Sequence, residues 1–244
     1  MAVTTVDAYG APKYGPIGRP PAGVVYHTPE WGDTPTLDNA IACAKWQATS
    51  SNTSGGSYHG ILGHDSAKYP DSIATCTVAD HWTMVRSVPW DQAAGGLSSA
   101  RDSTWAPGRY PWIQQLVSAD AYSDPNRWFH QISISGKAAW YVANGYPKGL
   151  VIRLAEWVKV LEGAYKYDAV LTCHRHWQTN RSDPGPTTLP DLVLEEYGLL
   201  TPDYKALYEA EKAKTSTLQT TIQAQTQTIA QLKTKIAAAK SALA

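Results

Sequence analysis

Short runs of apolar residues alternate with stretches of helical periodicity over the first 200 residues of the chain. Apolar runs bounded by turn residues predict strands, and apolar side chains at intervals of three and four residues predict helices. The predicted strands span residues 23–28, 58–63, 73–78, 82–88, 128–135 and 169–173, and the predicted helices span residues 35–50, 111–120 and 147–165. Strands that alternate with helices predict an α/β fold, in which helices flank a mixed central β-sheet. Functional side chains are then expected at the ends of strands.

Two local features refine these elements. Thr34 is the predicted N-cap of the helix over residues 35–50, and Pro35 takes its first position, where the missing backbone N–H of proline costs nothing. Residues 91–110 are rich in Gly, Ala and Ser and predict a long surface loop, a kind of segment that often carries function.

The composition divides the chain into three parts. Residues 1–22 contain several Gly and Pro and predict an extended N-terminal arm. Residues 23–202 hold the alternating strands and helices and form the predicted main domain. Residues 203–244 contain neither Gly nor Pro, and Ala, Thr, Gln and Lys dominate them, which predicts a long C-terminal helix.

The C-terminal helix carries a heptad pattern typical of a coiled coil. Its apolar seam positions are Leu218, Ile222, Ile229, Leu232, Ile236 and Leu243. Gln225 and Ala239 fill the intervening seam positions, where the polar residue sets the register of the two helices. The pattern favours a parallel two-stranded coiled coil, and hence a homodimer formed through this tail. The alternative is a single solvated helix that docks on the domain or frays.

Composition and charge argue against several classes of function. The 21 Lys and Arg balance the 21 Asp and Glu, whereas a general nucleic-acid binder would carry a basic surface. No run of about 18 apolar residues predicts a membrane-spanning helix. Cys43, Cys76 and Cys173 form no disulfide framework, which indicates synthesis in a reducing compartment. The N-terminal sequence lacks the basic start and apolar core of a signal peptide.

The segment HRHWQTNRSDPG, residues 174–185, concentrates the candidate chemistry of the chain. It places two histidines and an aspartate after a predicted strand, and His27 ends the first predicted strand. A zinc site needs imidazole, carboxylate or thiolate donors that converge, and a catalytic zinc keeps one position for water. His27, His174 and Asp183 are therefore candidate ligands, and spacing alone leaves His176 as an alternative to His174. The remaining histidines are interpreted as packing or surface residues: His59, His64, His81 and His130.

Three blocks in the order VVYHT, SYHGILGHD and HRHWQTNRSDPG resemble the zinc-dependent N-acetylmuramoyl-L-alanine amidases. These enzymes share a fold with peptidoglycan recognition proteins and include phage endolysins. The resemblance implies a Zn²⁺ ion bound by His27, His174 and Asp183, with Tyr58 and Arg181 as catalytic residues. It also implies hydrolysis of the amide between N-acetylmuramic acid and L-alanine in bacterial peptidoglycan.

The resemblance covers roughly residues 20–200 and has one clear departure. Many relatives carry a glutamate near the zinc at the end of a strand, and Ser135 takes that place here, which leaves Tyr58 as the acid–base candidate. The alternative function is a non-catalytic peptidoglycan-binding module of the same fold. A structural protein built around the coiled-coil tail is less attractive, because the tail is a short part of the chain.

The resemblance to phage endolysins also implies where the protein acts. Without a signal peptide it would be made in the host cytoplasm and would reach the bacterial cell wall after release through a separate pore protein. Bacterial peptidoglycan is then the expected partner, and neither nucleic acid nor membrane insertion is expected.

Overall fold

The protein, seen here in a computed structural model, divides into two compact units, Met1–Leu200 and Thr201–Ala244. The structure describes residues 5–8, 10–11, 13–17, 21–49, 56–97, 125–165, 170–200, 221–222, 224–229 and 231–233. The described residues of the second unit are helical, and four residues of the predicted seam are exposed there: Ile222, Gln225, Ile229 and Leu232. Pairing of this helix with a second chain stays a prediction. In the described ranges, no helix combines the length and the apolar character needed to cross a membrane.

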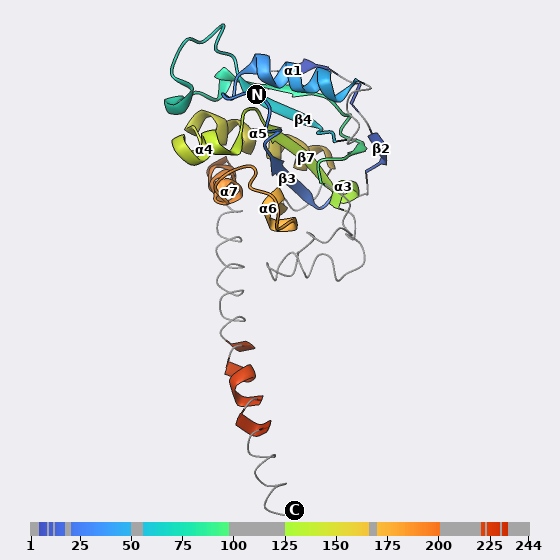
Figure 1. Ribbon diagram of the computed structural model, residues 1–244, viewed down its shortest axis with the longest axis vertical. Helices are drawn as coiled ribbons and strands as arrows, with labels where there is room; N and C mark the ends of the chain where they lie inside the picture. The colour runs from blue at the N-terminus through green and yellow to red at the C-terminus, as the bar shows by residue number, and fades with distance from the viewer. Residues whose placement is uncertain are drawn as a thin grey trace, which may run out of the picture. The chain divides into compact units, whose positions relative to one another are not determined.

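A mixed β-sheet of six strands lies at the centre of the first unit (Figure 1). In spatial order its strands are β1 (Thr5–Asp7), β5 (Trp82–Arg86), β4 (Gly60–His64), β7 (Phe129–Ile134), β3 (Gly23–His27) and β8 (Val170–Cys173). The β4–β5 pair is antiparallel, and the other pairs of this sheet are parallel. A separate antiparallel pair consists of β2 (Lys13–Pro16) and β6 (Gln92–Ala94). This arrangement confirms the predicted α/β fold with a mixed central sheet.

Helices pack on both faces of the sheet (Figure 1). The helical elements are α1 (Leu37–Gln47), η1 (Ile73–Thr75), η2 (Ala79–His81), α3 (Pro125–Trp128), α4 (Ala138–Asn144), α5 (Lys148–Tyr165), α6 (His174–Trp177) and α7 (Leu189–Leu200). Helix α1 packs on the face that carries Ile61 and Val85. Tyr165 of α5 contacts His130 of β7. Because Ser133 lies opposite Ile61 and side chains alternate along a strand, His130 points to the other face.

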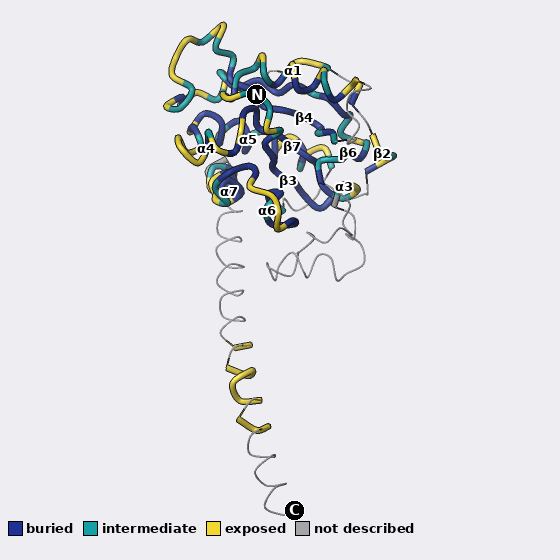
Figure 2. Tube along the Cα trace, in the orientation of Figure 1, coloured by how far each residue is buried: buried dark blue, intermediate teal, exposed yellow. Residues whose placement is uncertain are grey.

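The central strands are buried along their whole length (Figure 2). This burial is expected for parallel strands that helices cover on both faces. Strands β3, β4 and β8 all run parallel to their neighbours β7 or β3, so their C-terminal ends lie at one edge of the sheet. Polar residues that end these strands are therefore brought to the same edge.

Most predicted elements of the main domain are confirmed. The predicted strands other than 73–78 lie within a few residues of β3, β4, β5, β7 and β8, and the helix over 147–165 corresponds to α5. Strands β1 and β2 lie within the segment predicted to be an N-terminal arm. Helices α4 and α7 lie in stretches for which no helix is predicted. The predicted helix over 111–120 and residues 98–110 of the predicted loop lie outside the described residues.

The helix predicted from residue 35 begins at Leu37, and Thr34 as its N-cap is wrong. The N-cap is Thr36, whose hydroxyl accepts a hydrogen bond from the Asn39 backbone N–H at 3.2 Å. Pro35 stays outside the helix because its carbonyl oxygen accepts a hydrogen bond from the backbone N–H of His64 at 2.8 Å. Because of this hydrogen bond to the end of β4, the helix begins two residues later than predicted.

The strand predicted over Ile73–Val78 is wrong, because Ile73–Thr75 forms the 3-10 helix η1. β-branched residues favoured a strand here. However, β4 already pairs with β5 and β7, and β5 pairs with β4 and β1, so neither strand next to this segment has an open edge. The segment turns away instead, and the backbone N–H of Cys76 donates to the carbonyl oxygen of Ile73 at 3.3 Å.

We expect the fold to lose stability as the pH falls from about 6.5 towards about 4, and buried His59 to contribute to this loss. Its Nδ1 accepts a hydrogen bond from the Gln131 backbone N–H at 2.8 Å, and its Nε2–H donates to the Gln92 carbonyl oxygen at 2.7 Å. Burial lowers the pKa of His59 from 6.5 to about 4. The unfolded chain therefore takes up the proton first as the pH falls, which removes up to roughly 3 kcal/mol of stability.

Urea unfolding of the metal-free protein, followed by tryptophan fluorescence at a series of pH values, measures this effect. A His59→Asn variant keeps a hydrogen-bond acceptor near the position of Nδ1 but does not titrate. The free energy of unfolding of this variant should depend less steeply on pH than that of the unsubstituted protein. Equal slopes in the two proteins would show that His59 does not carry the effect.

Candidate metal centre

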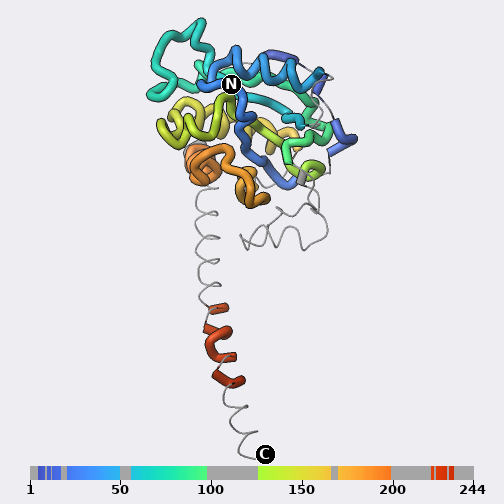
Figure 3. Tube along the Cα trace, in the orientation of Figure 1, coloured from blue at the N-terminus to red at the C-terminus, as the bar shows by residue number. Residues whose placement is uncertain are grey.

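Three polar side chains meet at the C-terminal edge of the sheet. His27 is the last residue of β3, His174 directly follows β8, and Asp183 lies in the turn after α6. Strand β3 pairs directly with β8, with Tyr26 opposite Cys173. This pairing brings together two segments that lie far apart along the chain, as the blue and orange parts of the trace show (Figure 3).

The ligand atoms of these residues form a small triangle. The Nδ1 atoms of His27 and His174 lie 3.1 Å apart, and Asp183 Oδ2 lies 3.0 Å from His174 Nδ1 and 3.5 Å from His27 Nδ1. A tetrahedral metal ion with bonds of about 2.0–2.2 Å separates its ligand atoms by about 3.3–3.6 Å. All three side chains are buried. The triangle therefore has nearly the size of three corners of a tetrahedral metal site.

The outer nitrogen of each imidazole contacts a glutamine. His27 Nε2 lies 2.7 Å from Gln131 Oε1, and His174 Nε2 lies 2.6 Å from Gln178 Oε1. Gln131 Nε2 donates to the Phe129 carbonyl oxygen at 3.2 Å, so the glutamine oxygen faces His27 and accepts from its Nε2–H. A neutral imidazole protonated at Nε2 presents the lone pair of Nδ1 to the centre of the triangle.

The charges of the site also suit a cation. Burial lowers the pKa of His27, although Asp183 counteracts this effect, so the neutral imidazole is favoured. Burial alone would raise the pKa of Asp183, but its contacts with His174 and His27 hold it well below its usual range. The neutral imidazole of His27, the imidazole of His174 and a carboxylate thus meet at one point, which is unfavourable unless a proton or a metal ion lies between them. His27, His174 and Asp183 are also one of the groups of described residues that can hold a metal ion.

Among the two histidines of α6, His174 joins this triangle and His176 does not. His176 Nδ1 lies 2.9 Å from Thr172 Oγ1 and accepts a hydrogen bond from the Cys173 backbone N–H at 3.4 Å. The His176 ring is therefore turned back onto β8. Ser135, which the sequence resemblance matches to a glutamate of many relatives, is fully buried just after β7, and its carbonyl oxygen accepts a hydrogen bond from the Tyr141 hydroxyl.

Tyr58 and Arg181 both lie near the triangle. The centroid of the Tyr58 ring is 5.1 Å from that of His27. Burial and the Asp183 carboxylate raise the pKa of Tyr58 well above its usual range, and the positive charge of Arg181 partly offsets this rise. The Tyr58 hydroxyl is therefore a proton donor in this surrounding. Arg181 itself is exposed, in the same turn as Asp183.

The two glutamines behind the histidines were not predicted from the sequence. Gln131 lies in the middle of a strand that is buried at every residue, so its polar amide there was a usable signal. Gln178 follows His174 by four residues, the spacing that places two side chains on one side of a helical turn. Both residues fix the orientation of an imidazole. Gln131 lies outside the three family blocks quoted above, and Gln178 lies inside HRHWQTNRSDPG.

We expect Gly96→Ala to weaken metal binding, because Gly96 lies directly against the His27–Gln131 hydrogen bond. A Cβ at Gly96 would come within 2.9 Å of His27 Nε2 and 2.7 Å of Gln131 Oε1. Losing such an outer partner typically lowers metal affinity by about 10–100-fold. Competitive titration of the metal-free protein with zinc measures the change. Gly163→Ala on α5 is the matched control, because nothing lies within 4 Å of its added Cβ. Equal affinities in the two variants would contradict this role of Gly96.

Comparison with known proteins gives structural neighbours. No family model matches the chain, and no curated protein matches it. The N-acetylmuramoyl-L-alanine amidase LysC from Clostridium intestinale URNW is 13% identical, with a TM-score of 0.41 over 77% of this chain and 91% of the amidase. Drosophila peptidoglycan recognition protein SA is 13% identical, with a TM-score of 0.48 over 75% of this chain and 87% of that protein.

A third neighbour is the Ph2119 endolysin from a Thermus scotoductus MAT2119 bacteriophage. It is 14% identical, with a TM-score of 0.42 over 75% of this chain and 89% of the endolysin. The three neighbours are thus an amidase, a recognition protein and an endolysin.

Proposed function

We propose that this protein is a zinc-dependent amidase of the phage endolysin type, which hydrolyses the amide between N-acetylmuramic acid and L-alanine in bacterial peptidoglycan. The observation that carries the proposal is the buried triangle of His27 Nδ1, His174 Nδ1 and Asp183 Oδ2. Three protein ligands leave one tetrahedral position for water or substrate, which is the arrangement of catalytic zinc sites. The order of the three sequence blocks supports the substrate class.

The residues of the centre suit an amide hydrolase. A zinc ion bound there would polarise the amide carbonyl and lower the pKa of a bound water towards about 7. His27 and His174 would hold the ion as neutral donors whose orientation Gln131 and Gln178 fix. Asp183 would offset part of the positive charge of the ion. Its carboxylate oxygen is a harder ligand than a thiolate and therefore selects less strongly for zinc.

Tyr58 and Arg181 would act on the reacting amide. Because the Tyr58 hydroxyl is protonated, it would donate a hydrogen bond that orients the reactants. It would give its proton to the leaving amine and regain one from the attacking water. Arg181 would stabilise the oxyanion that develops on the carbonyl oxygen with its fixed positive charge. Its exposed position in the turn beside Asp183 leaves it accessible to a large wall substrate.

A non-catalytic peptidoglycan-binding module is the second candidate. It is favoured by Ser135, because this buried residue supplies no carboxylate where many relatives place one. The complete set of three metal donors favours catalysis instead. Under either function we propose that the protein acts at the cell wall after synthesis in the host cytoplasm, and that the C-terminal helix joins two chains.

Product analysis of purified peptidoglycan incubated with the full chain tests the proposal. We expect free amino groups of L-alanine to appear without new reducing sugar ends. Removal of metal with a chelator should abolish their release, and added zinc should restore it. New reducing ends without free amino groups would contradict amidase activity. Sedimentation of the zinc-loaded protein with peptidoglycan, without any soluble product, would favour the binding module.

A further inference from the structure

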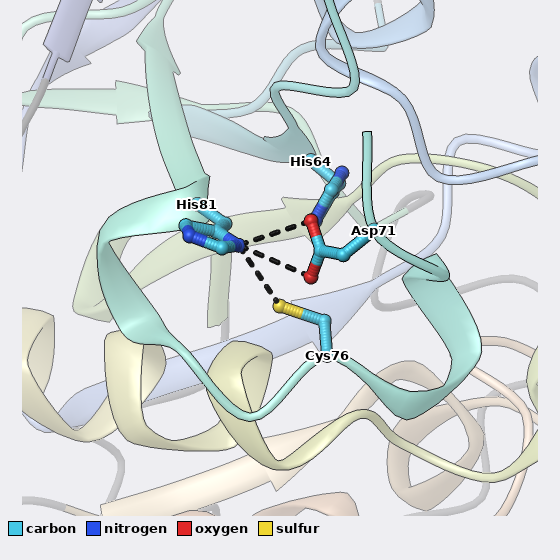
Figure 4. Close-up of side chains that lie close together, drawn as sticks. All are labelled: His64, Asp71, Cys76 and His81. Carbon is cyan, nitrogen blue, oxygen red and sulfur yellow. Dashed lines mark hydrogen bonds and ion pairs between the residues drawn. The ribbon is translucent and has the colours of Figure 1, made fainter. Parts of the chain in front are cut away.

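A second group of metal-ligating side chains lies outside the proposed amidase centre, in the segment that connects β4 to β5 (Figure 4). Its members are His64, Asp71, Cys76 and His81. Figure 4 shows the Asp71 carboxylate and the Cys76 thiol directed at the ring of His81, with the His64 ring beside the carboxylate. The sequence analysis interpreted His64 and His81 as packing or surface residues.

Three contacts between the ligand atoms of this group have distances close to those of a tetrahedral zinc site, and all four ligand atoms lie within 4.8 Å of one another. His81 Nδ1 lies 3.2 Å from each carboxylate oxygen of Asp71 and 3.7 Å from Cys76 Sγ. His64 Nε2 lies 3.4 Å from Asp71 Oδ1. With zinc bonds of about 2.0–2.2 Å to nitrogen and oxygen and about 2.3 Å to sulfur, tetrahedral ligand atoms lie about 3.3–3.7 Å apart.

The fold brings the four residues together from one connecting segment. His64 lies opposite Trp82 in the β4–β5 pair, and the Asp65 backbone N–H donates to the His81 carbonyl oxygen at 2.8 Å, so both ends of the segment are joined. In the middle, the Gly149 backbone N–H of α5 donates to the Cys76 carbonyl oxygen at 2.9 Å. The positions of His64, Cys76 and His81 are therefore fixed by backbone contacts.

The ring of His64 carries a nitrogen that faces the group and makes no hydrogen bond. His64 is fully buried, and among the described residues its Nε2 has no hydrogen-bond partner, although the Asp71 carboxylate lies 3.4 Å away. The other ring nitrogen, Nδ1, forms a hydrogen bond with Ser66 Oγ at 3.1 Å. A buried ring nitrogen without a hydrogen bond lowers the stability of the fold. A metal ion beside Asp71 would give this nitrogen a partner.

The same geometry argues against a thiol-based catalytic triad. In such a triad the histidine contacts the nucleophile through one ring nitrogen and the carboxylate through the other. Here Cys76 Sγ and both Asp71 oxygens face the same atom, His81 Nδ1. Cys76 is also buried, and its thiol donates to the Val78 carbonyl oxygen at 3.5 Å. Convergence on a single point suits a metal ion and does not suit proton relay.

We propose that His64, Asp71, Cys76 and His81 bind a second zinc ion as a structural site. Four protein ligands close the coordination sphere and leave no position for substrate, and a donor set with one thiolate and two imidazoles favours zinc over magnesium or calcium. Strand β7 separates β4 from β3, so the site lies roughly 10 Å or more from the His27 centre. The ion would tie the β4–β5 connection together where Arg153 of α5 contacts Ala79 and Asp80.

Cobalt substitution distinguishes the two sites, because the proposed second site contains a sulfur ligand and the amidase centre does not. Metal-free full chain titrated with Co²⁺ should develop a thiolate-to-cobalt charge-transfer band in the near ultraviolet. The band should persist in His27→Ala and in Cys43→Ser, a control that removes another buried thiol. It should vanish in Cys76→Ser while Co²⁺ still binds at the His27 centre. No band in the unsubstituted protein, or a band that survives Cys76→Ser, would overturn the proposal.

Zinc content gives a second readout that does not depend on activity. Mass spectrometry under native conditions should find two zinc ions per unsubstituted chain and one in each of the variants His27→Ala and Cys76→Ser. Zinc should raise the melting temperature of His27→Ala but not of a double His27→Ala, His81→Asn variant. If Cys76→Ser does not fold, an alkylation experiment on the unsubstituted protein takes its place. Bound zinc should then protect the Cys76 thiol from the alkylating reagent. Alkylation of Cys76 that zinc does not slow would count against the site.

Discussion

Asp183→Asn is expected to remove zinc from the His27–His174–Asp183 centre and to abolish amide hydrolysis. Asparagine keeps the size of the side chain but lacks the negative charge that holds a cation between two neutral imidazoles. The loss of zinc affinity should exceed the about 10–100-fold change typical for an outer partner such as Gln131. Zinc content after dialysis and the release of free amino groups from peptidoglycan are the two measurements.

Asp33→Asn is the matched control for this substitution. Asp33 is exposed, and its carboxylate pairs with Lys137 at 2.7 Å. This variant should keep its zinc and its activity. His27→Ala should behave like Asp183→Asn, because each removes one corner of the same triangle. If Asp183→Asn kept the zinc affinity of the unsubstituted protein, Asp183 would not be a ligand.

Tyr58→Phe is expected to lower kcat by about 10²–10⁴-fold, the range for loss of a general acid or base, while the zinc content stays the same. The substitution removes the hydroxyl but keeps the ring that packs 5.1 Å from the His27 ring. The protein should therefore fold and bind metal as before. Steady-state kinetics on soluble muramyl peptides, with zinc content measured on the same samples, tests this prediction.

Tyr14→Phe provides the control, because Tyr14 is exposed on β2. A change of less than about twofold for Tyr58→Phe would exclude its hydroxyl from the reaction, since positioned proton donors contribute far more. A parallel loss of zinc and activity in Tyr58→Phe would assign the residue a structural role at His27. Either result would leave Arg181 as the remaining catalytic candidate.

The sheet and the proposed ligands could be predicted from the sequence because both depend on local pattern. The buried run that ends at His27 and the run that ends before His174 are strong strand signals, and parallel pairing places their ends at one edge. The spacing of residues did not decide between His174 and His176, and only the family resemblance favoured His174. Residues two apart on a helical turn point roughly 200° apart, so the orientation of α6 decides which imidazole faces His27.

Other features depend on tertiary contacts that no local pattern encodes. Ile73–Val78 has the composition of a strand, but the edges of β4 and β5 are already occupied. The cluster of His64, Asp71, Cys76 and His81 follows from the path of that displaced segment. Its four residues have no regular spacing in the sequence, so only the folded connection between β4 and β5 reveals that they converge.

Anomalous diffraction at the zinc absorption edge from crystals of the zinc-loaded protein locates the metal ion and its ligands. We expect an anomalous peak at about 2.0–2.2 Å from Nδ1 of His27, Nδ1 of His174 and a carboxylate oxygen of Asp183, with a fourth position open to water. No peak within the triangle, or an ion held there by His176 in place of His174, would contradict this expectation.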